Sequence, residues 1–193
     1  MLKDPYNRTV TNLRISLTSR CNLRCIYCHA EGEVNPKEQM SADEIAELMR
    51  IGAQFGIRSV KFTGGEPMLR QDLVDIIRSV PPGIESSLTT NGTLLAPKAA
   101  DLKEAGLARV NVSLDTLRPE RYRRITGKDC LEDALEGIDA AIHVGLTPVK
   151  INMVLLDGIN EDEIDDFMAF VRGKRDLVLQ VIELMEFNEC RFH

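Results

Sequence analysis

Three cysteines lie close together near the start of the chain, in the stretch SLTSRCNLRCIYCHAEG at residues 16–32. Cys21, Cys25 and Cys28 have the spacing C-x3-C-x2-C, and the other two cysteines are distant in sequence. Thiolates are good ligands for zinc and for iron–sulfur clusters. An odd number of cysteines with three crowded together favours a metal site over a disulfide framework.

Three thiolates leave a metal centre incomplete. A structural zinc ion closes its tetrahedron with four ligands, and His29, directly after Cys28, would be an awkward fourth ligand. A [4Fe–4S] cluster takes one ligand per iron, so three cysteines leave one iron open to a small molecule. The spacing therefore favours an open [4Fe–4S] cluster, with a zinc site or a ferredoxin-type electron carrier as the alternatives.

The composition is that of an ordinary globular protein, with 193 residues, 44% hydrophobic and 28% charged. A net charge of −6 argues against a non-specific nucleic-acid binder. The polar first residues lack a signal-peptide core, and no apolar run approaches the length of a membrane span. We expect one cytoplasmic domain over residues 1–193, with no nucleic-acid or membrane partner.

Six strand patterns alternate with amphipathic helical segments. The expected strands are residues 12–18, 60–63, 86–92, 109–115, 149–156 and 177–184. Strands joined by helical crossovers form a parallel sheet. Ser41 and Glu44 have capping-box spacing at the start of the first helix. The apolar spacing predicts that one helix buries Ile45, Leu48, Met49 and Phe55, and that a later helix buries Leu131, Leu135, Ile138 and Ile142. Residues 119–124 are predicted to form a solvated helix start, and residues 160–163 are predicted to cap another helix.

The strands have one apolar and one polar face. In the first strand, Leu13, Ile15 and Leu17 alternate with polar side chains. A doubly wound sheet would be apolar on both faces. We therefore expect an α/β fold of the partial, TIM-like (βα)6 barrel type with a polar lumen. The lumen would carry the cations Arg14, Lys61 and Lys150, which suit a phosphate or carboxylate; the alternative is that these are merely solvated strand faces.

Several segments together resemble the radical S-adenosylmethionine (SAM) superfamily. They are the cysteine loop with Tyr27, the segment TGGEP at residues 63–67, VNVSLD and IELM. The resemblance implies a [4Fe–4S] cluster on Cys21, Cys25 and Cys28, with SAM as the second cofactor. It also implies SAM contacts at Tyr27, Gly65, Ser113 and Met185. Glu66 would bond the methionine amine, or alternatively serve as an acidic residue at a helix N-terminus.

Five longer segments point to one family within this superfamily, because together they resemble the archaeal GTP 3′,8-cyclases of molybdenum cofactor biosynthesis. These segments are NLRISLTSRCNLRC, KFTGGEP, LTTNGTLL, AGLARVNVSLDTL and VKINMVLLDGIN. In that family SAM is cleaved reductively, the 5′-deoxyadenosyl radical removes the ribose 3′ hydrogen of GTP, and the ribose closes onto guanine C8. The implied GTP contacts are Arg14, Lys61, Thr89 and Lys150. Ser59 and Gln180 stand where bacterial relatives have basic residues, so the triphosphate site would have fewer cationic side chains here.

The family continues for about another hundred residues, roughly one small domain, with a second three-cysteine cluster that holds guanine. This chain ends at His193 with Cys190 nearby. The resemblance implies GTP as substrate, an electron donor such as ferredoxin or flavodoxin, and leaves a homodimer open. Two alternatives remain: a radical SAM enzyme acting on another substrate, such as a peptide, and a non-catalytic metal-binding or electron-transfer module.

Overall fold

The computed structural model describes residues 1–28 and 39–184, and six strands form one sheet in this part of the chain. Every neighbouring pair is parallel, and the order across the sheet follows the order along the chain. The sheet therefore begins at β1 and ends at β6 without closing on itself. The strands are β1 (Asn12–Ser16), β2 (Ser59–Thr63), β3 (Glu85–Thr90), β4 (Arg109–Ser113), β5 (Val149–Leu155) and β6 (Leu177–Glu183).

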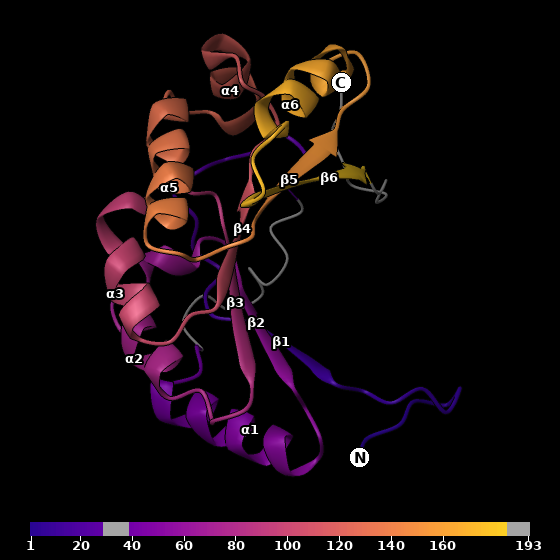
Figure 1. Cartoon of the computed structure of the whole chain (residues 1–193), viewed down its shortest axis with the longest axis vertical. Coiled ribbons are helices and arrows are strands. Elements are labelled where there is room, and N and C mark those ends of the chain that lie inside the picture. Colours follow the sequence, from indigo (N-terminus) through magenta and orange to yellow (C-terminus); the bar gives the residue numbers. More distant parts are fainter. Residues whose placement is uncertain (29–38, 185–193) are drawn as a thin grey trace.

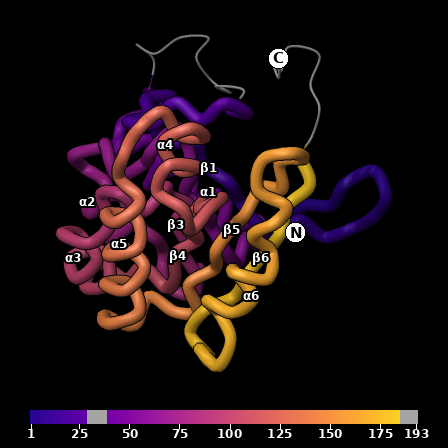
Figure 2. Tube along the Cα trace, turned by 90° about the horizontal axis from the view of Figure 1, so that it is seen from above, coloured from indigo at the N-terminus to yellow at the C-terminus, as the bar shows by residue number. Residues whose placement is uncertain are grey.

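The helices lie together on one face of this sheet (Figure 1). A right-handed crossover repeated in one direction places each helix on the same face, whereas a doubly wound sheet reverses its strand order. Seen from above, α2, α3, α5 and α6 lie outside the strands (Figure 2). This arrangement confirms the expected α/β partial barrel. The helices are α1 (Ala42–Gln54), α2 (Leu73–Arg78), α3 (Ala99–Glu104), α4 (Pro119–Thr126), α5 (Leu131–His143) and α6 (Ile164–Val171), with short 3-10 helices η1 (Pro67–Leu69), η2 (Ala96–Lys98) and η3 (Glu161–Glu163).

The hydrophobic core lies between the sheet and its helices. Alternate strand residues such as Ile15, Phe62, Val110 and Ile151 are buried there, at 2% exposure or less. Their neighbours along each strand face the opposite, helix-free side. On that side Asn111 of β4 is only 2% exposed, although the helices of the described chain lie on the opposite face of the sheet (Figure 1). The sheet therefore curves so that side chains of adjacent strands crowd together.

Helix α1 begins as the sequence predicts. Ser41 and Glu44 form a capping box, in which the Glu44 N–H donates to the Ser41 hydroxyl and the Ser41 N–H donates to the Glu44 carboxylate. The predicted inner face is only half right, because Ile45 and Met49 are buried whereas Leu48 and Phe55 are 37% and 47% exposed. Helix α1 is the first of the helical layer, so one flank of it has no helix beside it in the described part of the chain (Figure 1).

The crossover from β4 to β5 contains two helices, α4 and α5. A solvated helix start was expected at residues 119–124, and α4 does begin at Pro119 with Glu120, Arg123 and Arg124 exposed, although Tyr122 is buried. Helix α5 buries Leu131 and Ile138 as predicted, but it also buries Ala134 and Ala141, whereas Leu135 and Ile142 are only partly buried. Small residues line this face of α5 because the helix packs very closely against the loop after β3: a Cβ at Gly137 would lie 2.3 Å from the Gly92 carbonyl oxygen.

No helix within residues 1–28 and 39–184 combines the length and the apolar character that crossing a membrane requires.

Candidate functional site

The cysteine loop follows β1 at the carboxyl end of the sheet. Cys21 and Cys28 are exposed and Cys25 is half-buried, and none forms a disulfide. Backbone hydrogen bonds hold the loop against the end of α4, since the Arg24 and Ile26 N–H groups donate to carbonyls of α4 at 2.9 Å each. The cysteine between these two anchors is thereby fixed in position.

The glycine pair of TGGEP holds the start of the same loop. The Gly65 N–H donates to the Thr18 carbonyl (2.7 Å), and the Glu66 N–H donates to the Arg20 carbonyl (2.8 Å). A Cβ at Gly65 would lie 2.4 Å from the Arg20 carbonyl oxygen, so only glycine permits this approach. Gly64 also has a positive φ of 145°. The structure thus gives this motif a role in shaping the cysteine loop.

Glu66 caps the 3-10 helix η1 and is fully buried. One carboxylate oxygen accepts from the Met68 N–H (2.9 Å) and the Thr90 hydroxyl (2.7 Å), and the other accepts from the Asn91 N–H (2.7 Å). Burial raises the pKa of the Glu66 carboxyl, and these hydrogen bonds oppose the rise. The geometry supports the helix-terminal interpretation, and contact with the SAM amine stays a prediction.

Two further contacts bind the cysteine loop to distant strands. Asn22 exchanges side-chain hydrogen bonds with the β3 loop, accepting from Asn91 (2.8 Å) and donating to Thr93 (2.9 Å). The Tyr27 phenol donates to the Asp115 carboxylate (2.6 Å), whose other oxygen accepts from the Val154 N–H (2.8 Å). Tyr27, located between Cys25 and Cys28, is therefore held by the strands β4 and β5.

Burial governs the electrostatics of this loop. It raises the pKa of the Cys25 thiol to about 12, helped by the charge of Asp115 and by the neighbouring cysteines. It also raises the pKa of Cys21 and of Tyr27, and lifts the pKa of the Asp115 carboxyl to about 6. Thiols in such surroundings deprotonate when a metal centre supplies positive charge.

The donor set fits a four-iron cluster better than a zinc ion. A structural zinc ion gathers four ligands around one centre, and the cysteine loop offers three thiols. A four-iron cluster gives each iron its own thiolate, so its three ligands stand apart. The cysteines Cys21, Cys25 and Cys28 are thus suited to a cluster with one open iron. His29 lies outside the described residues.

The predicted cations gather on the helix-free face. Arg14 in β1 is the register partner of Lys61 in β2, and Lys150 in β5 is the partner of Asn111 in β4. Burial lowers the pKa of the Lys61 ammonium, and the charges of Arg14, Lys150 and Arg109 lower it further. The positive charges therefore lie close enough to repel one another, and a bound anion would reduce this repulsion.

Two of the other predicted contacts, Thr89 and Ser113, lie on the same face. Thr89 in β3 accepts a hydrogen bond from Asn111 (3.3 Å). Ser113 is half-buried at the end of β4, and its register partner Asn152 has a buried side-chain oxygen without a hydrogen-bond partner in the described part of the chain. Gly65 is exposed beside the cysteine loop. Met185 lies outside the described residues, so its predicted role stays a prediction.

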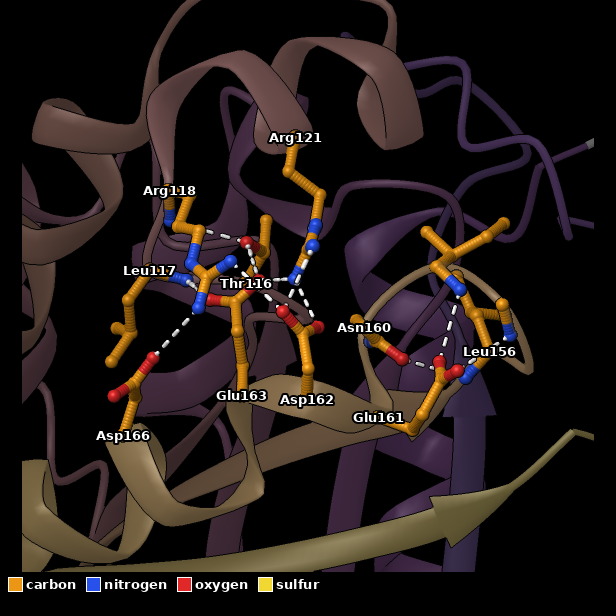
Figure 3. A network of polar contacts seen from close by, with 12 residues as sticks. Thr116, Leu117, Arg118, Arg121, Leu156, Asn160, Glu161, Asp162, Glu163 and Asp166 are labelled. Carbon is orange, nitrogen blue, oxygen red and sulfur yellow. Dashed lines mark hydrogen bonds and ion pairs between the residues drawn. The ribbon is translucent and has the colours of Figure 1, made fainter.

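Sequence reasoning missed a polar network centred on the buried Glu163 (Figure 3). Glu163 is fully buried and accepts from the Thr116 hydroxyl (2.6 Å), the Leu117 N–H (2.8 Å) and the Arg121 guanidinium. Residues 160–163 are thus more than a cap, because Asn160 donates to the Asp115 carbonyl (2.8 Å). Through α4 and Asp115 this network supports the cysteine loop. The local sequence held no signal for it beyond the acidic run itself.

The family model of the radical SAM superfamily matches residues 15–171, which is more than half of the 193-residue chain. The chain belongs to the radical SAM superfamily. The cofactors of this superfamily are a [4Fe–4S] cluster and SAM, which agrees with the donor set of the cysteine loop.

Curated relatives match nearly the whole of this radical SAM chain. "Probable GTP 3′,8-cyclase" of Methanocella arvoryzae is 56% identical over 189 residues, covering 97% of this chain and 61% of the relative. The protein of that name from Archaeoglobus fulgidus is 54% identical, with 97% and 64% coverage, and that from Pyrococcus abyssi is 51% identical, with 95% and 60% coverage. The chain thus spans about three fifths of the length of these relatives.

Solved structures confirm the fold of this radical SAM core. Streptococcus suis SuiB bound to S-adenosylmethionine superposes with a TM-score of 0.80 at 19% identity, covering 93% of this chain and 42% of SuiB. The anSMEcpe protein with bound AdoMet superposes with a TM-score of 0.72 at 22% identity, covering 91% and 51%. At these identities the similarity concerns the fold alone.

Proposed function

We propose that residues 1–193 form a single radical SAM core domain, and that this core carries out the radical chemistry of a GTP 3′,8-cyclase in molybdenum cofactor biosynthesis. The observation that carries the proposal is the 56% identity to the Methanocella arvoryzae relative across 97% of this chain. The cations on the helix-free face support it independently, because a nucleoside triphosphate needs such partners.

The cysteine loop holds the cluster in this proposal. Cys21, Cys25 and Cys28 would each supply one thiolate to the cluster, which would leave one iron open to SAM. When bound, the cluster and SAM supply a one-electron reduction and the radical that abstracts a hydrogen atom. Asp115 keeps Tyr27 in place through a 2.6 Å hydrogen bond, and the glycine pair keeps the loop against β2.

The strand ends bind SAM and the strand faces bind GTP. Tyr27, Gly65 and Ser113 would contact SAM, while Glu66 either contacts the methionine amine or positions the backbone. Met185, outside the described residues, is predicted from the sequence as a further SAM contact. Arg14, Lys61, Thr89 and Lys150 bind the triphosphate through charge-assisted hydrogen bonds, each worth about 1.5–3 kcal/mol. These groups hold the ribose of GTP near the cluster end of the strands, where it can lose its 3′ hydrogen.

The same chemistry bears on the electron donor, the cellular compartment and the oligomeric state. The cluster needs an external electron, which a ferredoxin or flavodoxin would deliver. Free thiols suit the reducing cytoplasm. A homodimer is compatible with the fold, and no residue of the described site requires a partner copy.

The test is anaerobic reconstitution with iron and sulfide, followed by addition of SAM, dithionite and GTP deuterated at the ribose 3′ position. We expect 5′-deoxyadenosine that carries deuterium. The Methanocella arvoryzae relative is the positive reference, and Cys25→Ala is the negative control. Unlabelled 5′-deoxyadenosine would indicate a radical SAM enzyme with another substrate. A full cluster without any 5′-deoxyadenosine would indicate a non-catalytic core.

A further inference from the structure

A fourth cation stands beside the three predicted from the sequence. Arg109 begins β4 and alternates with Val110, so it shares the helix-free face with Asn111. The register pairs Arg109 with Ser87, Ser87 with Lys61, and Lys61 with Arg14. One row of residues across β1 to β4 therefore carries three cations on a single face of the sheet.

The partner of Arg109 is the carboxylate of Glu85, at the first residue of β3. Glu85 precedes Ser87 by two positions, so both residues face the same side as Arg109. The Arg109 and Glu85 side chains keep 35% and 52% of their exposure. An ion pair this open to water contributes little to stability, so Arg109 can exchange its partner readily.

The cations act on one another electrostatically. Burial lowers the pKa of Lys61, and the charges of Arg14, Lys150 and Arg109 add to that effect, which places all four groups within Coulombic range. A triphosphate carries more negative charge than Arg14, Lys61 and Lys150 neutralise. Arg109 would complete the charge balance, and Glu85 would compete with the anion for it.

We propose that Arg109 is a fourth cationic ligand of the triphosphate and that Glu85 is a competing counter-charge, which holds Arg109 while the site is free of anions. The inference rests on the proposed function and adds a specificity-determining pair to it. Its consequence is that the two members of one ion pair have opposite effects on anion binding.

The experiment measures binding of inorganic tripolyphosphate to the 193-residue chain by isothermal titration calorimetry at low and moderate salt. We expect Arg109→Ala to weaken binding about fivefold or more, and Glu85→Gln to strengthen it about threefold. Arg109→Lys should recover part of the loss because the charge returns. The matched controls are Arg78→Ala and Asp75→Asn, an exposed ion pair on α2 away from this face, which should change affinity less than twofold.

Equal affinity of Arg109→Ala and the parent would overturn the proposal, and so would weaker binding by Glu85→Gln or no binding by the parent at millimolar tripolyphosphate. Circular dichroism checks that each variant folds, and Arg109→Gln, which also removes the charge, takes the place of Arg109→Ala if the alanine variant does not fold. The assay needs neither cluster nor SAM, so it is independent of the deuterium-transfer test. Arg109-dependent binding without deuterium transfer from GTP would leave the anion site standing and overturn the proposed reaction.

Discussion

Replacing Gly65 with alanine should destroy the cluster site while leaving the fold intact. The new Cβ would lie 2.4 Å from the Arg20 carbonyl oxygen and 2.7 Å from both the Arg20 carbonyl carbon and the Ser19 oxygen. All three atoms belong to the main chain, so the loop must move by about an ångström to restore ordinary contact. The loop that moves is the one that carries the cysteines.

The energetic cost of Gly65→Ala follows from the contacts that the shift breaks. Overpacking costs about 1–3 kcal/mol. The hydrogen bonds from the Gly65 and Glu66 N–H groups, 2.7 and 2.8 Å long, contribute about 1 kcal/mol each. The total of about 3–5 kcal/mol is below the stability of a typical domain of about 5–15 kcal/mol. We therefore expect a folded chain whose displaced loop fails to hold iron.

Two measurements check this prediction: urea unfolding of the metal-free chain, and iron content with the visible absorption spectrum after anaerobic reconstitution. Gly52→Ala is the matched control, since its nearest neighbour is the Ile57 side chain at 3.3 Å and helix α1 gains about 1 kcal/mol from alanine. If Gly65→Ala bound as much iron as the parent and unfolded at the same urea concentration, the role assigned to the glycine pair would be refuted.

Three further predictions concern the cysteine loop and the cations of the helix-free face. Cys21→Ala should abolish iron binding whereas Cys130→Ala should not, as iron analysis after reconstitution will show; iron loss in Cys130→Ala would contradict the ligand assignment. A double-mutant cycle with Tyr27→Phe and Asp115→Asn should give a coupling energy of about 1 kcal/mol or more in urea unfolding, because the 2.6 Å hydrogen bond is partly buried; additive effects would argue against it. Lys61 must be charged to bind an anion and its pKa is lowered, so tripolyphosphate affinity should fall as the pH rises through a value below the ordinary 10.5. Removing Arg109 takes away one charge that lowers the pKa of Lys61, so the loss of tripolyphosphate affinity should occur at a higher pH. Calorimetry at several pH values measures this, and an unchanged pH dependence would contradict the prediction.

The sequence alone predicts the parts of the molecule that depend on neighbours in the chain. The capping box of Ser41 and Glu44 involves residues three positions apart, and it forms as predicted. Strand alternation placed Arg14, Lys61 and Lys150 on the polar face, because successive side chains in any strand point to opposite sides. The spacing of Cys21, Cys25 and Cys28 likewise places three thiols in one loop whatever surrounds it.

Tertiary structure decides which distant residues meet, and local patterns do not encode that. Tyr27 and Asp115 are 88 positions apart and meet only because the cysteine loop reaches across to β4. Glu163 reads as one more residue in an acidic run, yet burial against Thr116 and Arg121 makes it a fixed part of the support for the loop. The position of Arg109 beside the other cations depends on strand register. Register and burial arise from packing of the whole sheet, so the chain must fold before these residues acquire their partners.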